Sequence, residues 1–490
     1  MQCTTRKTSR RRFLAGAAAG LTILPSVRLA RAYQANERLN LAVLGTMYNA
    51  EHFLSASHIY NASVVALCDP DRRNIAKTLA RWKENAARME AADNPTDRQS
   101  AERYRRMAEG EGVTMHADIR RLFDEMSDSV DALVVSHYDH LHGVACGAAL
   151  RGGKPVCSER PLGLNISDAR TLRSLAAETR LPVTYRSPGT GTGQFRRAME
   201  LVEEGAIGPV REAHVWFSRG GPDRDTVPQG PQPIPAELNW DLWLGPLRWR
   251  EYHPDWAAYS HWRETCSGGL GVFGAHTSIF PFLTLKLRSL WDQPAGQGTI
   301  RVTAECSRLN RVSFPRWERV RWEIPGRGEM APVTITWHHG PDFAPGTREL
   351  IHAKMREFGV ADAAEADTLM GTAGSMLVGG DGALVANDHS VQVTGLPKAK
   401  FAQITTDQPL RIPSSRGIYR DWIDACRGEK PQILANFDNG GPLSELLMLG
   451  NIATQYPEET LSYDPAEGRV TNKTEANRLL GFEYRDGWKI

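Results

Sequence analysis

Residues 131–161 read DALVVSHYDHLHGVACGAALRGGKPVCSERP, and this stretch decides the fold. The apolar run 131–136 predicts a buried strand, the small residues of 142–152 predict a helix, and 155–158 predicts a second strand. Two short strands joined by a helix form a βαβ crossover, which is the unit of a parallel sheet. Ligands of such sheets bind where the strands end, so the polar residues after each strand are the candidate site.

These polar residues resemble a pattern of the Gfo/Idh/MocA dehydrogenases, the family that contains glucose–fructose oxidoreductase and inositol dehydrogenases. The pattern N/D-x-x-H, helix, G-K-x-V-x-x-E-K-P stands here as Asp139-His140-Leu141-His142 and Gly153-Lys154-Pro155-Val156-Cys157-Ser158-Glu159-Arg160-Pro161. The resemblance implies an α/β protein with an N-terminal Rossmann-like parallel sheet domain. It also implies a C-terminal α/β domain with a large open, mostly antiparallel sheet, and oxidoreductase activity with NAD(P) on a sugar, cyclitol or sugar derivative.

The length of 490 residues favours two domains, and the formal charge of +2 suggests neither nucleic acid nor an anionic membrane as a partner. We expect a signal peptide over 1–32 and the Rossmann-like domain over 33–161, with a charged helical insertion at about 80–112. The sheet and substrate domain is expected over 162–490, with C-terminal helices that pack back on the first domain. By analogy with the family, we also expect a homo-oligomer.

The N-terminus has the features of a twin-arginine export signal. Ser9-Arg10-Arg11-Arg12-Phe13-Leu14 matches the motif, a mildly apolar run follows over 14–24, and Ala30-Arg31-Ala32 has the form of a cleavage site. The apolar run is too short for a permanent membrane span. We therefore expect a periplasmic or otherwise extracytoplasmic protein that is exported in the folded state, with its cofactor tightly bound.

The first two predicted strands, NLAVLG (40–45) and VVALCD (64–69), frame a dinucleotide-binding turn. Asp69 is placed to accept the hydroxyls of the adenosine ribose, and its charge would repel a 2′-phosphate, so NAD is favoured over NADP. The glycine fingerprint is poor, because Gly45-Thr46-Met47-Tyr48-Asn49-Ala50 keeps only the first glycine. The predicted cofactor-binding residues are Gly45, Thr46, Tyr48, Asn49, Asp69, Ser136, His137, His142 and Glu159.

The predicted catalytic residues are Arg160, His276 and Glu159. In the family a lysine and an Asp-x-x-x-His motif flank the substrate, and the resemblance implies that they hold or deprotonate a hydroxyl. Here the lysine is Arg160, and the second motif keeps His276 but has Val272 in place of the aspartate. Arginine cannot act as a base in a protein, and valine cannot orient an imidazole. Three features of the ordinary dehydrogenase pattern are therefore missing from this sequence: the full glycine fingerprint, the lysine and the aspartate.

The remaining titratable residues suggest no further site. No Cys/His spacing indicates a metal, and the six cysteines after the signal show no disulfide pattern. His140 is open to a structural role as well as a cofactor contact. The pair His338-His339 has no partner at a meaningful spacing, and we expect it at the surface.

Three functions stay open from the sequence. The first is an exported oxidoreductase with retained NAD that oxidises one sugar-like substrate and reduces another. The second is a redox-neutral lyase or hydrolase on (keto-)glycosides, in which Arg160 supplies electrostatic stabilisation. The third is a sugar-binding protein without catalysis. All three rest on one expectation, that the ends of the two strands in 131–161 converge with His276 on one pocket.

Overall fold

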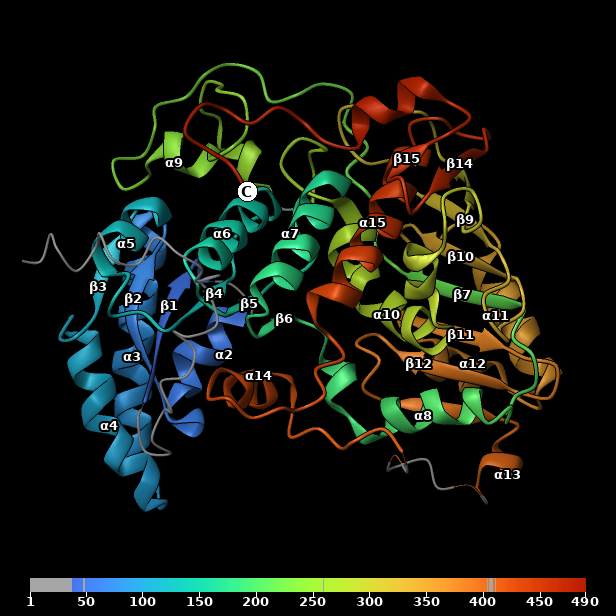
Figure 1. The fold of residues 1–490 in the computed structure, drawn as a ribbon, viewed down its shortest axis with the longest axis horizontal. Helices are drawn as coiled ribbons and strands as arrows, with labels where there is room; N and C mark the ends of the chain where they lie inside the picture. Colours follow the sequence, from blue (N-terminus) through green and yellow to red (C-terminus); the bar gives the residue numbers. More distant parts are fainter. Residues whose placement is uncertain (1–37, 47–48, 259, 403, 405–408, 410) are drawn as a thin grey trace, which may run out of the picture.

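The computed structural model describes residues 38–46, 49–258, 260–402, 404, 409 and 411–490. The predicted signal peptide and Tyr48 lie outside these residues, and so does Met47. Two α/β lobes lie side by side, and the chain ends beside helix α6 of the first lobe (Figure 1). Within the described residues no helix is long and apolar enough to cross a membrane.

The first lobe contains a six-stranded parallel sheet in the order β3-β2-β1-β4-β5-β6. The strand order reverses between β1 and β4, which is the switch point where such sheets bind ligands. The strands are β1 (Leu39–Leu44), β2 (Ala62–Cys68), β3 (Thr114–His116), β4 (Ala132–Val135), β5 (Val156–Ser158) and β6 (Val183–Tyr185).

The opening stretch folds as predicted, with β4 and β5 joined by α6 (Asp139–Arg151). The sheet continues past residue 161, however, because α7 (Ile166–Thr179) makes one more crossover to β6. The predicted end of the first domain is therefore too early. The other helices of this lobe are α2 (Asn49–Ala56), α3 (Arg72–Glu90), α4 (Pro95–Ala108) and α5 (Ile119–Met126).

The predicted charged insertion is the second half of α3 together with α4. Its exposed faces carry the charges, but Trp82 and Tyr104 are fully buried and join the apolar core under the sheet. The amphipathic pattern of these helices is what fixes them to the sheet.

The second lobe contains a nine-stranded, mostly antiparallel sheet in the order β13-β12-β11-β7-β10-β9-β8-β14-β15, in which only β7 and β10 pair in parallel among the described residues. This arrangement confirms the predicted fold class. The strands are β7 (Glu212–Phe217), β8 (Ile300–Cys306), β9 (Glu318–Ile324), β10 (Val333–His339), β11 (Ala373–Val378), β12 (Ala383–Asn387), β13 (Val393–Leu396), β14 (Leu461–Asp464) and β15 (Arg469–Val470).

The helices after β6 are α8 (Gly193–Glu203), α9 (Trp240–Leu244), α10 (Ala275–Thr284), α11 (Thr347–Glu357), α12 (Ala363–Met370), α13 (Lys398–Phe401), α14 (Ile418–Cys426) and α15 (Phe437–Ala453). Helices α10 and α15 lie between the two sheets, and α11 and α12 cover the outer face of β7, β11 and β12. A single π-helical turn, η5 (Leu270–Gly274), leads directly into α10. The 3-10 turns are η2 (Ser57–Tyr60), η3 (Pro188–Gly191), η4 (Pro254–Ala257), η6 (Leu287–Asp292) and η7 (Thr474–Leu479).

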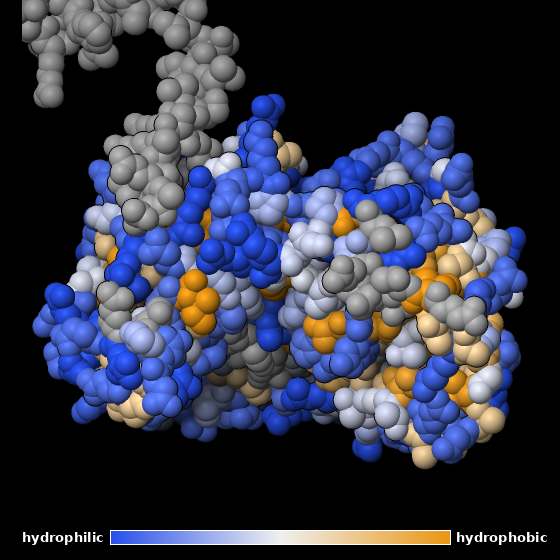
Figure 2. Space-filling model, turned by 90° about the horizontal axis from the view of Figure 1, so that it is seen from below, coloured by the Kyte–Doolittle hydropathy of each residue, from blue (hydrophilic) through white to orange (hydrophobic). Residues whose placement is uncertain are grey.

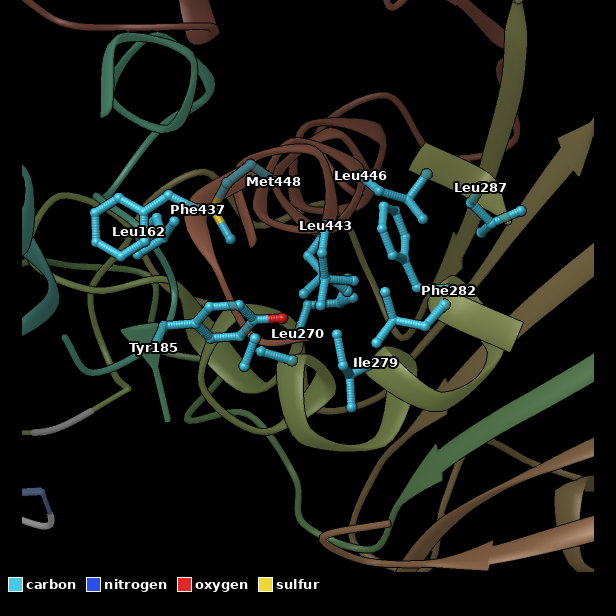
Figure 3. Close-up of a cluster of buried hydrophobic side chains, with 14 of the residues drawn as sticks. Leu162, Tyr185, Leu270, Ile279, Phe282, Leu287, Phe437, Leu443, Leu446 and Met448 are labelled. Atoms are coloured by element: carbon cyan, nitrogen blue, oxygen red, sulfur yellow. The ribbon is translucent and has the colours of Figure 1, made fainter. Parts of the chain in front are cut away.

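The two lobes share one apolar core around α10 and α15. In Figure 3, Leu443 of α15 points toward Ile279 of α10, and Tyr185 approaches from the end of β6. Helix α14 packs against the first lobe, where Trp422 is fully buried with core residues of that lobe. This shared core fixes the carboxyl ends of the parallel strands against α10.

The surface differs between the lobes. On the face in Figure 2, hydrophobic residues gather over the half formed by the C-terminal lobe, whereas the other half is mostly hydrophilic.

Candidate functional site

Two arginines lie at the carboxyl ends of the neighbouring parallel strands β5 and β6. Glu159 and Arg160 follow β5, and Arg186 follows β6, where its amide donates a hydrogen bond to the Ser158 carbonyl at 2.9 Å. Glu159 and Arg160 are both buried and form an ion pair with each other. Arg186 is half-buried. Buried charges persist only when they are paired or face a ligand, so this strand end is a polar site inside the molecule.

His276, in the first turn of α10, faces these arginines from the second lobe. Its side chain is 0% exposed, and neither ring nitrogen has a hydrogen-bond partner among the described residues. The pKa of His276 lies well below its usual value, mainly because the ring is buried and also because Arg160, His389 and Arg186 lie near it. The imidazole is therefore neutral. The structure thus brings Arg160, Glu159 and His276 together; their catalytic role stays a prediction.

Three further residues at this place were not predicted from the sequence: Arg186, His389 and Tyr419. The ring centroid of His389 lies 4.6 Å from that of His276, and its Nδ1 lies 2.9 Å from a carboxylate oxygen of Asp388. Tyr419, on α14, interacts with Arg186, and burial raises its pKa, so the phenol keeps its proton. Arg186 follows β6 as Arg160 follows β5, so the rule that polar residues after parallel strands form the site applies to both arginines.

Aromatic rings line the side of the site that faces the second sheet. Phe273 stacks on Phe217 at 4.1 Å, and its edge meets the rings of both His276 and His389. Phe217 and Phe273 are half-buried, whereas His276 behind them is fully enclosed. Phe217 and Phe273 therefore form an apolar wall of the site, and His276 and His389 lie against one side of it.

The expectation that His338 and His339 lie at the surface is wrong. The end of β10 is covered, and both residues are buried. His338 hydrogen-bonds with His214 at 3.1 Å, and Nδ1 of His339 lies 3.4 Å from the buried carboxylate of Glu318. Strand β10 lies in the middle of the sheet and is covered on both faces at this end. The local sequence does not show which other elements cover a strand.

The position of the family's aspartate is apolar in the structure as in the sequence. Val272 lies in η5, one turn before His276, and is buried. The nearby carboxylate belongs instead to Asp388, which is bound to His389 rather than to His276.

The turn after β1 keeps the one glycine that the geometry demands. Gly45 has φ 78°, and a Cβ there would lie 2.1 Å from the carbonyl oxygen of Ser136, so only glycine allows the ends of β1 and β4 to meet. Ser136 is buried at this contact, and Thr46 is half-buried beside it. Helix α2 begins at Asn49, whose side chain is outside the described set.

Asp69 lies at the end of β2, as expected for a ribose-binding acid. Its carboxylate accepts hydrogen bonds from the Asp71 amide at 2.8 Å and from the Asn74 amide group at 3.2 and 3.3 Å, and Nε2 of His137 lies 3.8 Å away. A carboxylate offers about four acceptor sites, so it retains capacity for a ribose hydroxyl. Asp69 and the Gly45 turn therefore fit a dinucleotide.

His142 and His140 hold the backbone in place. The ring nitrogens of His142 lie 2.9 Å from the Pro161 carbonyl and 3.0 Å from the His137 carbonyl, so the ring joins the two strand-end loops. Those of His140 lie 2.7 Å from the Trp243 carbonyl and 3.2 Å from the Thr265 carbonyl. Burial lowers the pKa of His140 to about 3 and also lowers that of His142. The predicted contact of His142 with a cofactor is untested.

The part of the chain that the structure describes contains no group of His, Cys, Asp and Glu residues that could hold a metal ion. Its cysteines, Cys68, Cys146, Cys157, Cys266, Cys306 and Cys426, are free thiols.

A six-stranded parallel sheet with a dinucleotide-type turn, joined to a second lobe with an open, mostly antiparallel sheet, defines a Rossmann-type α/β protein of two lobes. Residues 39–187 match the GFO_IDH_MocA family model, described as the oxidoreductase family with an NAD-binding Rossmann fold. The N-terminal lobe therefore matches the NAD-binding Rossmann domain of the Gfo/Idh/MocA oxidoreductases. The match also extends to residue 187, in agreement with the observed end of the first sheet.

Solved structures share the whole fold. GenD2 of gentamicin A biosynthesis, in complex with NAD, is 17% identical with a TM-score of 0.50, and the match covers 87% of this chain and 96% of that one. The WlbA dehydrogenase from Chromobacterium violaceum, in complex with NADH and UDP-GlcNAcA, is 12% identical with a TM-score of 0.50 (88% and 97% covered). An oxidoreductase from Pseudomonas syringae is 14% identical with a TM-score of 0.50 (87% and 99% covered). No curated protein sequence matches the chain.

Proposed function

We propose that this protein is an NAD-dependent oxidoreductase that acts on a hydroxyl or keto group of a sugar, cyclitol or sugar derivative. The observation that carries the proposal is the meeting of Arg160, from the Rossmann lobe, with His276, from the second lobe, whose two buried ring nitrogens have no hydrogen-bond partner among the described residues. A buried, unsatisfied imidazole costs free energy, and a bound hydroxyl would satisfy it.

The residues assigned to the cofactor are the Gly45 turn for the pyrophosphate end and Asp69 for the adenosine ribose. The carboxylate of Asp69 supports NAD over NADP, since it would repel a 2′-phosphate. When bound, NAD supplies the acceptor for a hydride.

Arg160 and Arg186 give the substrate side two guanidinium groups, one of which is paired with Glu159. A guanidinium binds a carboxylate in a bidentate way or polarises a carbonyl, and it cannot take up a proton. The neutral His276 can hold a hydroxyl by a hydrogen bond. This combination supports a uronic acid or a keto-sugar as the substrate.

The test is to purify the protein from its own export pathway, denature it, and identify released nucleotide by mass spectrometry. We expect NAD, together with reduction or oxidation of the bound nucleotide by a panel of glucose, glucuronate and myo-inositol. A nucleotide-free protein with no affinity for NAD in calorimetric titration overturns the proposal. Saccharide binding without turnover under any cofactor supports the non-catalytic alternative.

A second candidate is a redox-neutral lyase on keto-glycosides. The observation in its favour is that Arg160, a buried cation beside His276, occupies the position of the family's lysine. A fixed cation stabilises an enolate next to a keto group. Cleavage of a 3-keto-glucoside by the wild type, Arg160→Ala and His276→Ala variants tests it, and equal rates in all three remove this candidate.

We further propose export by the twin-arginine route, which rests on the motif at residues 9–14. A compartment without free nicotinamide requires a retained cofactor and a cycle in which one substrate is oxidised and another is reduced. Fractionation of cells that express the chain with Arg10→Lys and Arg11→Lys replacements tests the route. The variant should stay in the cytoplasm, while export of the variant at the wild-type level contradicts it.

A homo-oligomer formed through the open sheet is also proposed from the family resemblance. Helices α11 and α12 cover part of the outer face, and ion pairs Arg301–Glu323 and Arg319–Glu305 cross the exposed strands β8 and β9. A contact on this face would therefore be polar and weakened by salt. Light scattering at low and high ionic strength measures the mass of the particle.

A further inference from the structure

We infer that His389, oriented by Asp388, is the residue that exchanges a proton with the substrate hydroxyl, while His276 only binds it. This inference rests on the proposed oxidoreductase function. It assigns the proton-transfer role to a residue of the β12–β13 turn, far in sequence from the strand ends and from α10.

Exposure separates the two histidines. The His276 side chain is completely enclosed, whereas that of His389 is 30% exposed. A group that exchanges protons with a substrate must pass the proton on to solvent. His389 meets this condition, and its ring lies 4.6 Å from that of His276, so the two histidines stand side by side at the site.

The Asp388 carboxylate gives His389 the arrangement of a general base. Its Oδ2 lies 2.9 Å from Nδ1 of His389, and its Oδ1 accepts a hydrogen bond from the His389 amide at 2.8 Å. A carboxylate at this distance stabilises the imidazolium that forms when the His389 ring takes up a proton. His276 has no such carboxylate, because the corresponding position is Val272.

The turn that carries the pair is fixed to the site by its backbone. The Gly189 amide donates to the His389 carbonyl at 3.1 Å, and the Ser390 hydroxyl donates to the His276 carbonyl at 3.1 Å. A Cβ on Gly189 would lie 2.4 Å from the Ser390 carbonyl oxygen, so glycine is required for this close approach. Ser390 itself has φ 55°, a left-handed conformation that this docking stabilises. The turn is therefore built to hold His389 next to His276.

The atoms balance in the oxidation direction as follows. The O–H bond of the substrate breaks and its proton moves to Nε2 of His389. The C–H bond of the same carbon breaks and its hydride leaves to the nicotinamide, which is reduced, while the carbon becomes a carbonyl carbon. His389 then releases its proton to solvent through its exposed edge.

The kinetic test compares His389→Ala, Asp388→Asn and a matched control, His352→Gln, with glucuronate as substrate. His352 also pairs with a carboxylate, Asp367 at 3.1 Å, but lies on the outer face of the second lobe. His389→Ala should lower kcat by about 100-fold or more, with NAD affinity unchanged. Asp388→Asn should give a smaller loss, and His352→Gln none. Imidazole added to His389→Ala should restore part of kcat, which a structural role would not allow.

The second measurement needs no turnover. Diethyl pyrocarbonate is applied to the purified protein with its native ligands, and the modified histidines are located by mass spectrometry. We expect His389 to react several-fold faster than His276, and Asp388→Asn to slow the reaction at His389 but not at His352. Equal labelling of His389 in the wild type and Asp388→Asn, or a His389→Ala variant that imidazole does not rescue, overturns the inference. A protein that lacks bound nucleotide but shows the labelling difference contradicts the proposed function and leaves the Asp388–His389 arrangement supported.

Discussion

The hydroxyl of Tyr484 donates a hydrogen bond to the carboxyl group of Asp168, which ties together residues 316 positions apart. Asp168 is buried in the first turn of α7, and its other oxygen accepts a hydrogen bond from the Leu164 amide at 3.0 Å. This contact fastens the C-terminal segment to the first lobe close to the loop that follows Arg160. The candidate site thus depends on a group whose charge changes with pH.

The first prediction concerns this carboxyl group. Burial raises the pKa of Asp168 from 3.8 to about 6, so the native state binds a proton more tightly than the unfolded state. The contribution of Asp168 to stability is therefore full below about pH 4 and is lost as the pH rises to about 6, with a total of about 3 kcal/mol. Unfolding by guanidinium between pH 4 and 7 should show a smaller decrease in Asp168→Asn than in the wild type.

The control for that measurement is Tyr484→Phe. The Tyr484 hydroxyl lowers the pKa of Asp168, so its removal should extend the loss of stability to higher pH. Parallel pH curves for the wild type and both variants would show that Asp168 does not titrate in this window.

The second prediction concerns the influence of Arg160 on His276. Arg160 is one of the causes that lower the pKa of His276, and Arg160→Gln should raise that pKa toward its usual value. NMR titration of ring-labelled histidine measures the change, with Arg348→Gln on the outer face as the control. An unshifted His276 signal in Arg160→Gln means that the strand end and α10 do not meet as described.

The third prediction tests the turn after β1 by a matched pair of glycines. Gly45 and Gly153 have nearly the same backbone angle, φ 78° and φ 73°, but a Cβ on Gly45 would strike the Ser136 carbonyl while one on Gly153 meets open space. Gly153→Ala should cost about 1–2 kcal/mol from the left-handed conformation alone. Gly45→Ala should cost about 2–4 kcal/mol, because the contact adds to it, and should also weaken NAD binding. Chemical unfolding and calorimetry measure both quantities, and equal losses of stability would refute the steric argument.

The sequence predicted the fold better than the site. The alternation of apolar runs, small-residue helices and polar strand ends over 131–161 is local, so the βαβ unit and the positions of Glu159 and Arg160 could be predicted from it. Asp388 and His389 could not be, because they reach His276 only through the pairing of β11, β12 and β13 across the second sheet. Local periodicity carries no information about which distant turn docks on which helix. The same limit explains the buried His338 and His339, whose cover comes from other elements.

The last prediction separates two neighbouring histidines of α6 by what each one holds. His142 joins the Pro161 and His137 carbonyls, which belong to the two strand-end loops of the candidate site, whereas His140 joins the Trp243 and Thr265 carbonyls of the second lobe. A neutral imidazole carries a single N–H, so either change to alanine leaves one buried carbonyl without its donor and should lower the free energy of unfolding by about 1–3 kcal/mol. Only His142→Ala should also reduce the affinity for NAD, since only that variant frees the loops after β4 and β5. Calorimetric titration of both variants decides the matter, and an equal change in affinity would place the two histidines in the same structural role.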